Sequence, residues 1–508
     1  MISIVTFLPV LGGALLFCVD RRRETAIKHL AFGASLVTFL VSLGLYQGFR
    51  LDVPGPQFTE QTLWIGWLGV EYHVGVDGIS LLLVLLTTFL SAVAILSSYS
   101  AITTSVKEYM ICMLLLETGM VGVFVALDLV LFYVFWEGML IPMYFLIGIW
   151  GHERRVYAAV KFFLYTMAGS VLMLAGIIYL YNRAGTFDYT VLTEMMWTGK
   201  LTLGRVEQAA LFLGFFAAFA IKVPLFPLHT WLPDAHVEAP TAGSVMLASV
   251  MLKMGCYGLL RFCLPMFPAA ARGYAPWIAI LAIVGILYGA LVALVQPNMK
   301  KLVAYTSVSH LGFVVLGIFS FTELGVNGAV YQMLSHGIST GALFILVGFL
   351  YERRHSLEIK DYGGVATPAP ALATMFLSTS LASMGLPMLN NFVGEYLVLQ
   401  GTAQVNFRWA VFAAIGVILS ACYMLWLYQR VFFGETPASV RPHMRDSSAR
   451  EWAAMAPLLV LMVWMGTFTQ TFMPPIATAG ASILEKTKVN VEFQVKRPPP
   501  PLEVAHAR

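Results

Sequence analysis

Long apolar stretches separated by short polar segments occupy the chain up to residue 475. A transmembrane helix needs about 20 predominantly apolar residues. Windows of this kind lie near residues 2–19, 29–49, 78–99, 108–127, 129–149, 157–181, 208–226, 241–263, 275–295, 301–320, 325–350, 369–387 with 391–401, 408–432 and 452–473. The pattern predicts an all-α, multi-pass membrane protein with about fourteen transmembrane helices. Strand-like alternation is not the pattern, so a β-barrel is not expected.

Composition supports this interpretation. Of the 508 residues, 59% are hydrophobic and 11% are charged, whereas soluble domains are about a quarter charged. The basic residues are scattered through short loops, so no nucleic-acid partner is expected. The five cysteines show no paired spacing, and we interpret them as small apolar fillers. Membrane lipid is therefore the expected surrounding of most of the chain.

The distribution of lysine and arginine predicts an orientation. Loops after odd-numbered helices carry most of these residues, including Arg21–Arg23, Lys300 and Lys301. Because such loops stay in the cytoplasm, both termini are expected on the non-cytoplasmic side. The apolar segment 2–19 precedes the arginines, the reverse of the order in a signal peptide, so it is predicted to be the first membrane helix.

Two of the apolar stretches are interrupted by proline. Pro224 and Pro227 lie in IKVPLFPLHTW (221–231), and Pro387 lies in MGLPMLNNFVGE (384–395). Proline has no N–H, so a carbonyl in the preceding turn loses its helical donor. We expect three carbonyls to be freed in this way, those of Ala220, Val223 and Ser383. Interrupted helices at corresponding places in two halves indicate a transport site built on an inverted repeat.

Several ionisable residues lie well inside the predicted helices: Glu137, Lys222, Lys253, His310, His336 and Glu395. A charge at the bilayer centre costs about 2.5–3.5 kcal/mol on insertion scales, so such residues usually have a function. The alternatives are a Lys222 that extends to the interface, a neutral structural Glu137, and histidines that only stabilise the fold. Glu117 is similarly placed, but Thr118 could satisfy it locally.

Motifs for nucleotide, metal or nucleophilic chemistry are absent from the sequence. It contains no GxGxxG, no Walker A loop and no nucleophile elbow. No set of cysteines and histidines has the spacing of metal ligands. We therefore expect no catalytic redox residue, no bound cofactor and no metal in this chain.

Four segments closely resemble the antiporter-like proton-channel subunits of respiratory complex I. They are FYVFWEGMLIPMYFLIG, AIKVPLFPLHTWLPDAHVEAPTAGSV, YTSVSHLGF and GLPMLNNFVGE. The resemblance extends to about residue 475 and implies two inverted five-helix repeats, helices 4–8 and 9–13, with helices 7 and 12 broken. It divides the chain into N-terminal helices 1–3 (1–106), a first repeat (107–265), a second repeat (274–434), a C-terminal transmembrane helix (435–475) and a polar, proline-bearing tail (476–508).

The resemblance also implies roles for the ionisable residues. Glu137 and Lys222 would be the paired carboxylate and lysine of a first half-channel, and Lys253 the central lysine. His310 and His336 would belong to the polar axis, and Glu395 would be the acidic end of the second half-channel. The tail, which includes Pro498–Pro501, is expected to bury no core.

The function implied is proton translocation within an NADH-quinone oxidoreductase of the bacterial cytoplasmic membrane. The expected partners are L-like and N-like membrane subunits and lipid, and NADH, FMN, iron–sulfur clusters and quinone would bind to other subunits. An Mrp-type sodium/proton antiporter subunit and a subunit related to membrane-bound hydrogenases are the alternatives. A stand-alone solute transporter fits less well, because the polar residues extend along a line instead of surrounding one pocket.

Overall fold

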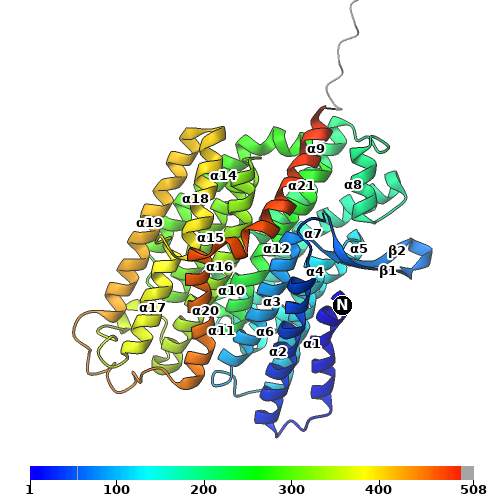
Figure 1. Cartoon of the computed structure of the whole chain (residues 1–508). Coiled ribbons are helices and arrows are strands. Elements are labelled where there is room, and N and C mark those ends of the chain that lie inside the picture. The colour runs from blue at the N-terminus through cyan, green and yellow to red at the C-terminus, as the bar shows by residue number, and fades with distance from the viewer. Residues whose placement is uncertain (54, 493–508) are drawn as a thin grey trace, which may run out of the picture.

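Long helices form one broad bundle in the computed structural model, which describes residues 1–53 and 55–492 (Figure 1). Among these residues, ten helical segments are long and apolar enough to cross a membrane. The chain is therefore a helical, multi-pass membrane protein, as predicted. Pro498–Pro501 lie outside the described residues.

Most helices of the first half follow the predicted apolar stretches, while α8 and α10 lie between them. Their bounds are α1 (Ile2–Phe17), α2 (Glu24–Gly48), α3 (Gly78–Ser97), α4 (Val106–Val125), α5 (Leu129–Gly138), α6 (Leu140–Trp150), α7 (Arg155–Ala184), α8 (Tyr189–Trp197), α9 (Arg205–Lys222), α10 (Trp231–Glu238), α11 (Thr241–Met246), α12 (Leu252–Gly258) and α13 (Leu264–Met266). Two π-helical turns, η2 (Leu247–Met251) and η3 (Leu259–Cys263), join α11, α12 and α13 into one span.

The second half continues in the same way. Its bounds are α14 (Pro268–Leu294), α15 (Met299–Ile318), α16 (Glu323–Arg354), α17 (Pro370–Ser383), α18 (Asn390–Val405), α19 (Phe407–Phe432), α20 (Ala449–Thr467) and α21 (Met473–Glu492). Short 3-10 turns occupy Gly66–Leu68, Ile359–Asp361 and Thr469–Thr471.

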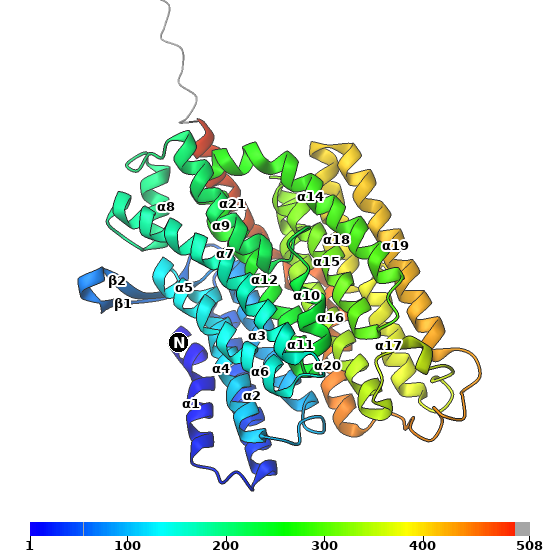
Figure 2. The same cartoon turned by 180° about the vertical axis from the view of Figure 1, so that it is seen from behind.

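Two spans form the buried centre of the bundle. The most apolar 18-residue windows of Thr241–Met266 and of α16 are completely buried, whereas the corresponding window of α7 is 39% buried. In Figures 1 and 2, α14, α15, α18 and α19 lie on one side of this centre, and α5, α7 and α8 lie on the other. Ionisable groups on the two central spans are thus surrounded by protein instead of lipid.

A β-hairpin between α2 and α3 departs from the purely helical prediction. Strands β1 (Gln57–Ile65) and β2 (Val70–Val76) pair antiparallel, with irregular register near each end of β1. The hairpin projects from the side of the bundle (Figure 1). The α-amino group of Met1 pairs with Glu60, and the Leu127 N–H donates to the His73 carbonyl at 2.8 Å. These contacts, which are remote in sequence, hold a segment that is too short and polar to span a membrane.

The segment predicted to be a polar tail from residue 476 is a helix as far as the described chain extends. Helix α21 lies diagonally across the bundle and contacts α16, α3, α13, α14 and α8 (Figure 1). Its residues Ile476, Ala479, Ile483, Leu484 and Thr487 are buried. The expectation that this part buries no core is therefore wrong for α21, because its sparse apolar residues recur at helical spacing on one face.

Candidate ion-translocation site

The first proline-bearing segment separates α9 from α10. Helix α9 ends at Lys222, and Trp231 begins α10. Two carbonyls near the break accept hydrogen bonds. The Leu225 N–H donates to the Ala220 carbonyl at 2.8 Å, and the Trp231 indole N–H donates to the Ile221 carbonyl at 2.8 Å. The Ala220 carbonyl is therefore not free, contrary to the prediction, because the chain after Pro224 turns back toward α9.

Lys222 is held at this break in an aromatic environment. Its side chain is fully buried, which excludes extension to the interface. The ammonium lies 5.5 Å from the ring centroid of Trp136 and 5.3 Å from that of Phe162. Among the described residues, Lys222 Nζ has no hydrogen-bond partner. Aromatic faces thus provide the local electrostatic stabilisation of the cation.

Glu137 lies at the end of α5, next to Trp136, and is half-buried. Its Oε1 atom has no hydrogen-bond partner among the described residues. No oxygen of Glu137 lies within 4.0 Å of Lys222 Nζ in the part of the chain that the structure describes. The structure therefore places Lys222 beside Trp136, the residue before Glu137, without a direct ion pair between Lys222 and Glu137.

The second proline-bearing segment is joined to α16 by polar side chains. Helix α17 ends at Ser383 and α18 begins at Asn390. The Asn391 side-chain amide donates to the Ser383 carbonyl at 3.2 Å, which is the carbonyl expected to be freed by Pro387. The Asn391 side-chain oxygen accepts from the Ser339 hydroxyl at 3.2 Å. Asn390 and Ser335 of α16 exchange two further hydrogen bonds, at 2.9 and 3.1 Å.

Glu395 lies in the first turns of α18 within a buried hydrogen-bond network. Its Oε1 atom is 2.7 Å from His310 Nδ1 and accepts from Gln332 Nε2 at 2.9 Å. The Tyr423 hydroxyl of α19 lies 3.2 Å from His310 Nε2. The side chains of His310 and Glu395 are 1% and 3% exposed. Helices α15 and α16 thus meet α18 at the Glu395 carboxylate, and α19 joins the network through His310.

Lys253 continues this network on the central span. Its Nζ atom donates to the Ala248 carbonyl in η2 at 2.5 Å and lies 2.6 Å from His336 Nδ1. The rings of His336 and His310 have centroids 5.6 Å apart. Lys253, His336, His310 and Glu395 therefore form a buried line across α12, α16, α15 and α18. A chain of titratable groups at such spacing can pass protons, with water or small side-chain movements bridging the gaps.

Close packing brings the first break toward this line. A Cβ atom added at Gly255 would lie 2.7 Å from the Phe219 carbonyl oxygen of α9. The helix that carries Lys253 can therefore approach the end of α9, where Lys222 lies, only because residue 255 has no side chain. This contact was not predicted, since it joins residues from separate spans.

Some buried polar residues were not among the predicted site residues. His236 is fully buried against Phe344, with ring centroids 4.6 Å apart, and neither of its ring nitrogens has a partner among the described residues. Lys300, predicted to lie in a loop, is 3% exposed and donates to the carbonyls of Ala239 and Val237. Glu117 is fully buried, and its oxygens have no partner in the described chain. Glu117 carried the same signal in the sequence as Lys222, an ionisable residue in an apolar segment, whereas His236 lies between the predicted spans 208–226 and 241–263.

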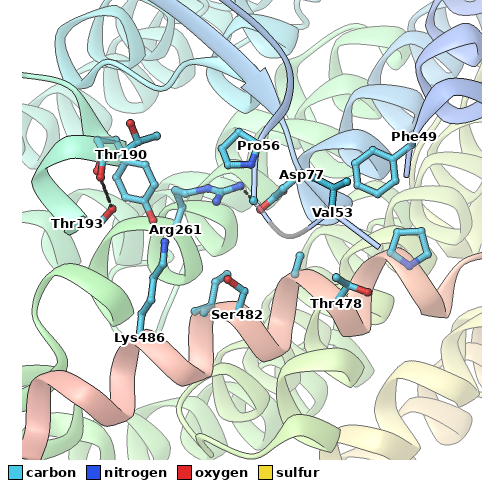
Figure 3. Close-up of a pocket in the computed structure, with 16 residues that line it drawn as sticks. Phe49, Val53, Pro56, Asp77, Thr190, Thr193, Arg261, Thr478, Ser482 and Lys486 are labelled. Carbon is cyan, nitrogen blue, oxygen red and sulfur yellow. Dashed lines mark hydrogen bonds and ion pairs between the residues drawn. The ribbon is translucent and has the colours of Figure 1, made fainter. Parts of the chain in front are cut away.

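Arg261 is a further buried ion that the sequence interpretation missed. It lies in η3 and forms an ion pair with Asp77 at 2.5 Å, and its Nε donates to the Tyr257 hydroxyl at 3.1 Å. The pair borders a cavity of about 100 Å³, which polar side chains of α8 and α21 also line (Figure 3). A cavity of this size, with the ion pair and hydroxyl groups on its wall, is large enough for water molecules. The signal was available, because Arg261 falls inside the predicted span 241–263.

Comparisons with known proteins identify related chains. A family model described as "NADH:quinone oxidoreductase/Mrp antiporter, TM" matches residues 126–421. The chain is 51% identical over 479 residues to NADH-quinone oxidoreductase subunit M of Rhodobacter capsulatus, covering 92% of this chain and 93% of that protein. A chain of respiratory complex I from Thermus thermophilus with bound NADH has a TM-score of 0.86 at 34% identity, covering 95% and 100%. A chain of the Mrp complex from Dietzia sp. DQ12-45-1b shares the fold, with a TM-score of 0.83 at 21% identity, covering 96% and 98%.

Proposed function

Because the chain belongs to the NADH:quinone oxidoreductase/Mrp antiporter transmembrane family, we propose that it is a proton-translocating membrane subunit of an NADH-quinone oxidoreductase. The chain is highly identical to a subunit M over most of both chains, which supports this choice. The similarity to the Mrp-type antiporter subunit is limited to the fold. Electron transfer from NADH to quinone would take place in other subunits, which would hold FMN, iron–sulfur clusters and the quinone site. L-like and N-like subunits would be the membrane neighbours.

The finer architecture is part of the proposal. Counting α5–α6, α9–α10, α11–α13 and α17–α18 as single spans and leaving out α8 and α21 yields about fourteen transmembrane helices. Helices α4 to α13 would form the first repeat and α14 to α19 the second, inverted one, with a proline-broken span in each. The protein would lie in the bacterial cytoplasmic membrane.

Both ends of the described chain would lie on the non-cytoplasmic side. Two contacts support this orientation. The α-amino group of Met1 pairs with Glu60 of the hairpin, and α21 contacts α8 near the same hairpin. The arginines at 21–23, which are expected to stay in the cytoplasm, lie at the opposite end of α1.

One observation carries the functional proposal, the buried line Lys253–His336–His310–Glu395. Each residue in this line lies within hydrogen-bond or ring-contact distance of the next. Burial of four titratable groups across four helices costs free energy that a structural scaffold would not need to spend. We propose that a proton passes along this line between the centre of the bundle and the break before α18. His310 can exchange a proton with Glu395 through Nδ1, and His336 with Lys253.

Lys222 and Glu137 would control the entry to this line. The separation of the two groups fits a lysine whose proton affinity depends on how close the carboxylate comes. When Glu137 approaches, the ammonium is favoured, and when it withdraws, the buried lysine releases its proton. Transport against a membrane potential must overcome about 2.3 kcal/mol per 100 mV. A change of a few pKa units, at about 1.4 kcal/mol each, is sufficient.

Neutralising either group tests the proposal. In the assembled complex reconstituted into vesicles, Glu137→Gln and Lys222→Ala should each lower proton pumping and the electron transfer coupled to it. Glu137→Asp keeps the charge and should be tolerated better. Glu194→Gln and Lys200→Ala change exposed residues of the same types and serve as controls. The quantities to measure are protons pumped per NADH oxidised and the rate of NADH oxidation.

Three outcomes would contradict the proposal. Normal pumping ratios and rates in both neutralised variants would reduce Glu137 and Lys222 to structural roles. Transport that follows sodium instead of protons would favour the Mrp-type alternative. An isolated chain that transports ions at full activity without partner subunits would contradict membership of a larger complex.

A further inference from the structure

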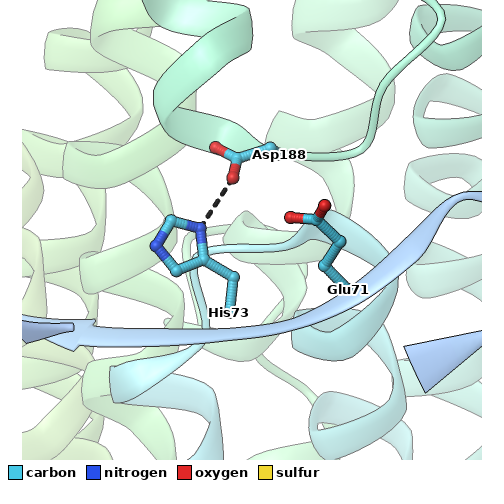
Figure 4. A group of neighbouring side chains, drawn as sticks. All are labelled: Glu71, His73 and Asp188. Atoms are coloured by element: carbon cyan, nitrogen blue, oxygen red, sulfur yellow. Dashed lines mark hydrogen bonds and ion pairs between the residues drawn. The ribbon is translucent and has the colours of Figure 1, made fainter. Parts of the chain in front are cut away.

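A second group of ionisable side chains lies outside the proton line, where the β-hairpin meets the loop before α8. Glu71 and His73 are two residues apart on β2, so their side chains point to the same face of the strand. Asp188 lies opposite them (Figure 4). One ligand atom from each of the three residues lies within 4.8 Å of the other two.

Two of the three groups are buried and already oriented. The exposed fractions of His73 and Asp188 are 6% and 4%. His73 Nδ1 and Asp188 Oδ2 are 2.6 Å apart, while Asp188 Oδ1 accepts from the N–H groups of Thr190 and Val191 at the start of α8. Capping therefore fixes one oxygen of Asp188 and directs the other oxygen at His73 and Glu71.

Negative charge exceeds positive charge around this group. Asp128 is a third carboxylate nearby, because its Oδ2 accepts from the Glu71 N–H at 3.2 Å. Among the described residues, no lysine or arginine forms an ion pair with Glu71, Asp128 or Asp188. The one basic side chain paired with any of them is His73, which contacts Asp188. Buried carboxylates are normally paired or coordinate a metal. A bound cation would supply the missing positive charge.

We propose that Glu71, His73 and Asp188 bind a divalent transition-metal ion, with zinc the best fit. One imidazole nitrogen and two carboxylate oxygens are a typical ligand set for zinc, with water in the fourth position. Calcium and magnesium prefer oxygen ligands alone. The ion would replace the proton that His73 Nδ1 shares with Asp188, and that proton would pass to solvent. Glu71 Oε2 accepts from Gln61 Nε2 at 2.5 Å, so its other oxygen is available to the ion.

Such a site would clamp the hairpin to the bundle. Its ligands come from β2 and from the residue that caps α8, two segments 115 residues apart. Metal binding would therefore restrict the hairpin without touching Lys222, Lys253 or Glu395. The site is independent of the proposed proton pathway.

Zinc binding by the purified complex tests this inference. The complex is treated with chelator and dialysed against buffered free Zn²⁺, and zinc per complex is measured by mass spectrometry. The wild type should hold one equivalent more than His73→Gln, and Glu71→Gln should bind this zinc at least about tenfold more weakly, since loss of even an outer-shell partner costs that much. His443→Gln, at an exposed histidine, should retain the full content. Calcium should not replace zinc.

Amide hydrogen exchange of the hairpin provides a second measurement. Zinc should slow exchange in residues 57–76 of the wild type and leave it unchanged in His73→Gln. If His73→Gln does not assemble, Glu71→Gln still decides the question, because the half-exposed Glu71 side chain can change without disturbing the core. Equal zinc content and equal hairpin exchange in the wild type and the assembled variants would overturn the proposal.

Discussion

The two proline-broken spans solve the same problem in opposite ways. At the end of α9, Lys222 faces Trp136 and Phe162, and no hydrogen-bond partner lies within reach among the described residues. At the start of α18, Glu395 accepts hydrogen bonds from α15 and α16. One break therefore holds a charge in an aromatic environment, and the other holds it in a polar network.

Magnitudes show what this difference means. A desolvated cation–π contact is worth about 2 kcal/mol, which is comparable to the cost of about 2.5–3.5 kcal/mol for a charge inside the membrane. Lys222 is thus close to balance, and a small change nearby can shift its proton affinity. Glu395 has hydrogen-bond partners that would be left unpaired if it moved. We therefore expect the proton affinity of Lys222 to respond to changes nearby, and Glu395 to be held firmly in its hydrogen-bond network.

The largest expected effect is the change in the free energy of unfolding when the buried charge of each region is removed. This change should have opposite signs in the two regions. Glu395→Leu leaves His310 and Gln332 without their buried acceptor, and breaking such a network costs about 3–5 kcal/mol. Lys222→Met removes a charge without a hydrogen-bond partner among the described residues and keeps an unbranched side chain beside Trp136 and Phe162, so stability should be unchanged or increased. Thermal unfolding of the purified complex, followed through this subunit, measures both changes.

Glu395→Gln is the matched control for this comparison, because its amide oxygen can still accept from Gln332. It should be less destabilising than Glu395→Leu. Equal loss of stability in Glu395→Leu and Lys222→Met would show that the two charges are held in the same way, and the comparison would fail.

A smaller effect is expected from the side chains that satisfy the carbonyls at each break. Asn391→Ala removes the donor to Ser383 and the acceptor of Ser339. Trp231→Phe removes the indole donor to Ile221 alone. Each unpaired buried group costs about 1–3 kcal/mol, so Asn391→Ala should lower the unfolding temperature more. The reverse order would indicate that the first break is the more dependent on side-chain hydrogen bonds.

The smallest effect concerns the outer edge of the second network. Tyr423→Phe removes the hydroxyl that lies 3.2 Å from His310 Nε2 and keeps the ring. Side-chain hydrogen bonds between membrane helices contribute about 0.6 kcal/mol on average. The unfolding temperature should therefore change little. The ratio of protons to electrons in reconstituted vesicles should fall if Tyr423 orients His310, and a wild-type ratio would limit Tyr423 to packing.

Local patterns in the sequence indicated most of the long helices and both breaks. Hydrophobic length is a property of consecutive residues, so most long helices lie close to the apolar windows. The breaks lie at Pro224, Pro227 and Pro387, whereas Pro9, Pro276 and Pro457 lie inside continuous helices. The free-energy cost of a charge inside the membrane also identified Lys222, Lys253 and Glu395 as exceptional, because this cost arises at each residue whatever its neighbours are.

Tertiary structure decided which groups meet. Lys253 lies beside His336, and His310 beside Glu395, across 83 and 85 residues of sequence, and no local pattern encodes such contacts. Three other features depend in the same way on surfaces that exist only after the helices pack. They are the absence of an ion pair between Glu137 and Lys222, the position of the hairpin, and the docking of α21. The sequence by itself determined where charges enter the membrane domain, and packing determined which of them share a hydrogen bond, because hydrogen bonds act over about 3 Å in space and not along the chain.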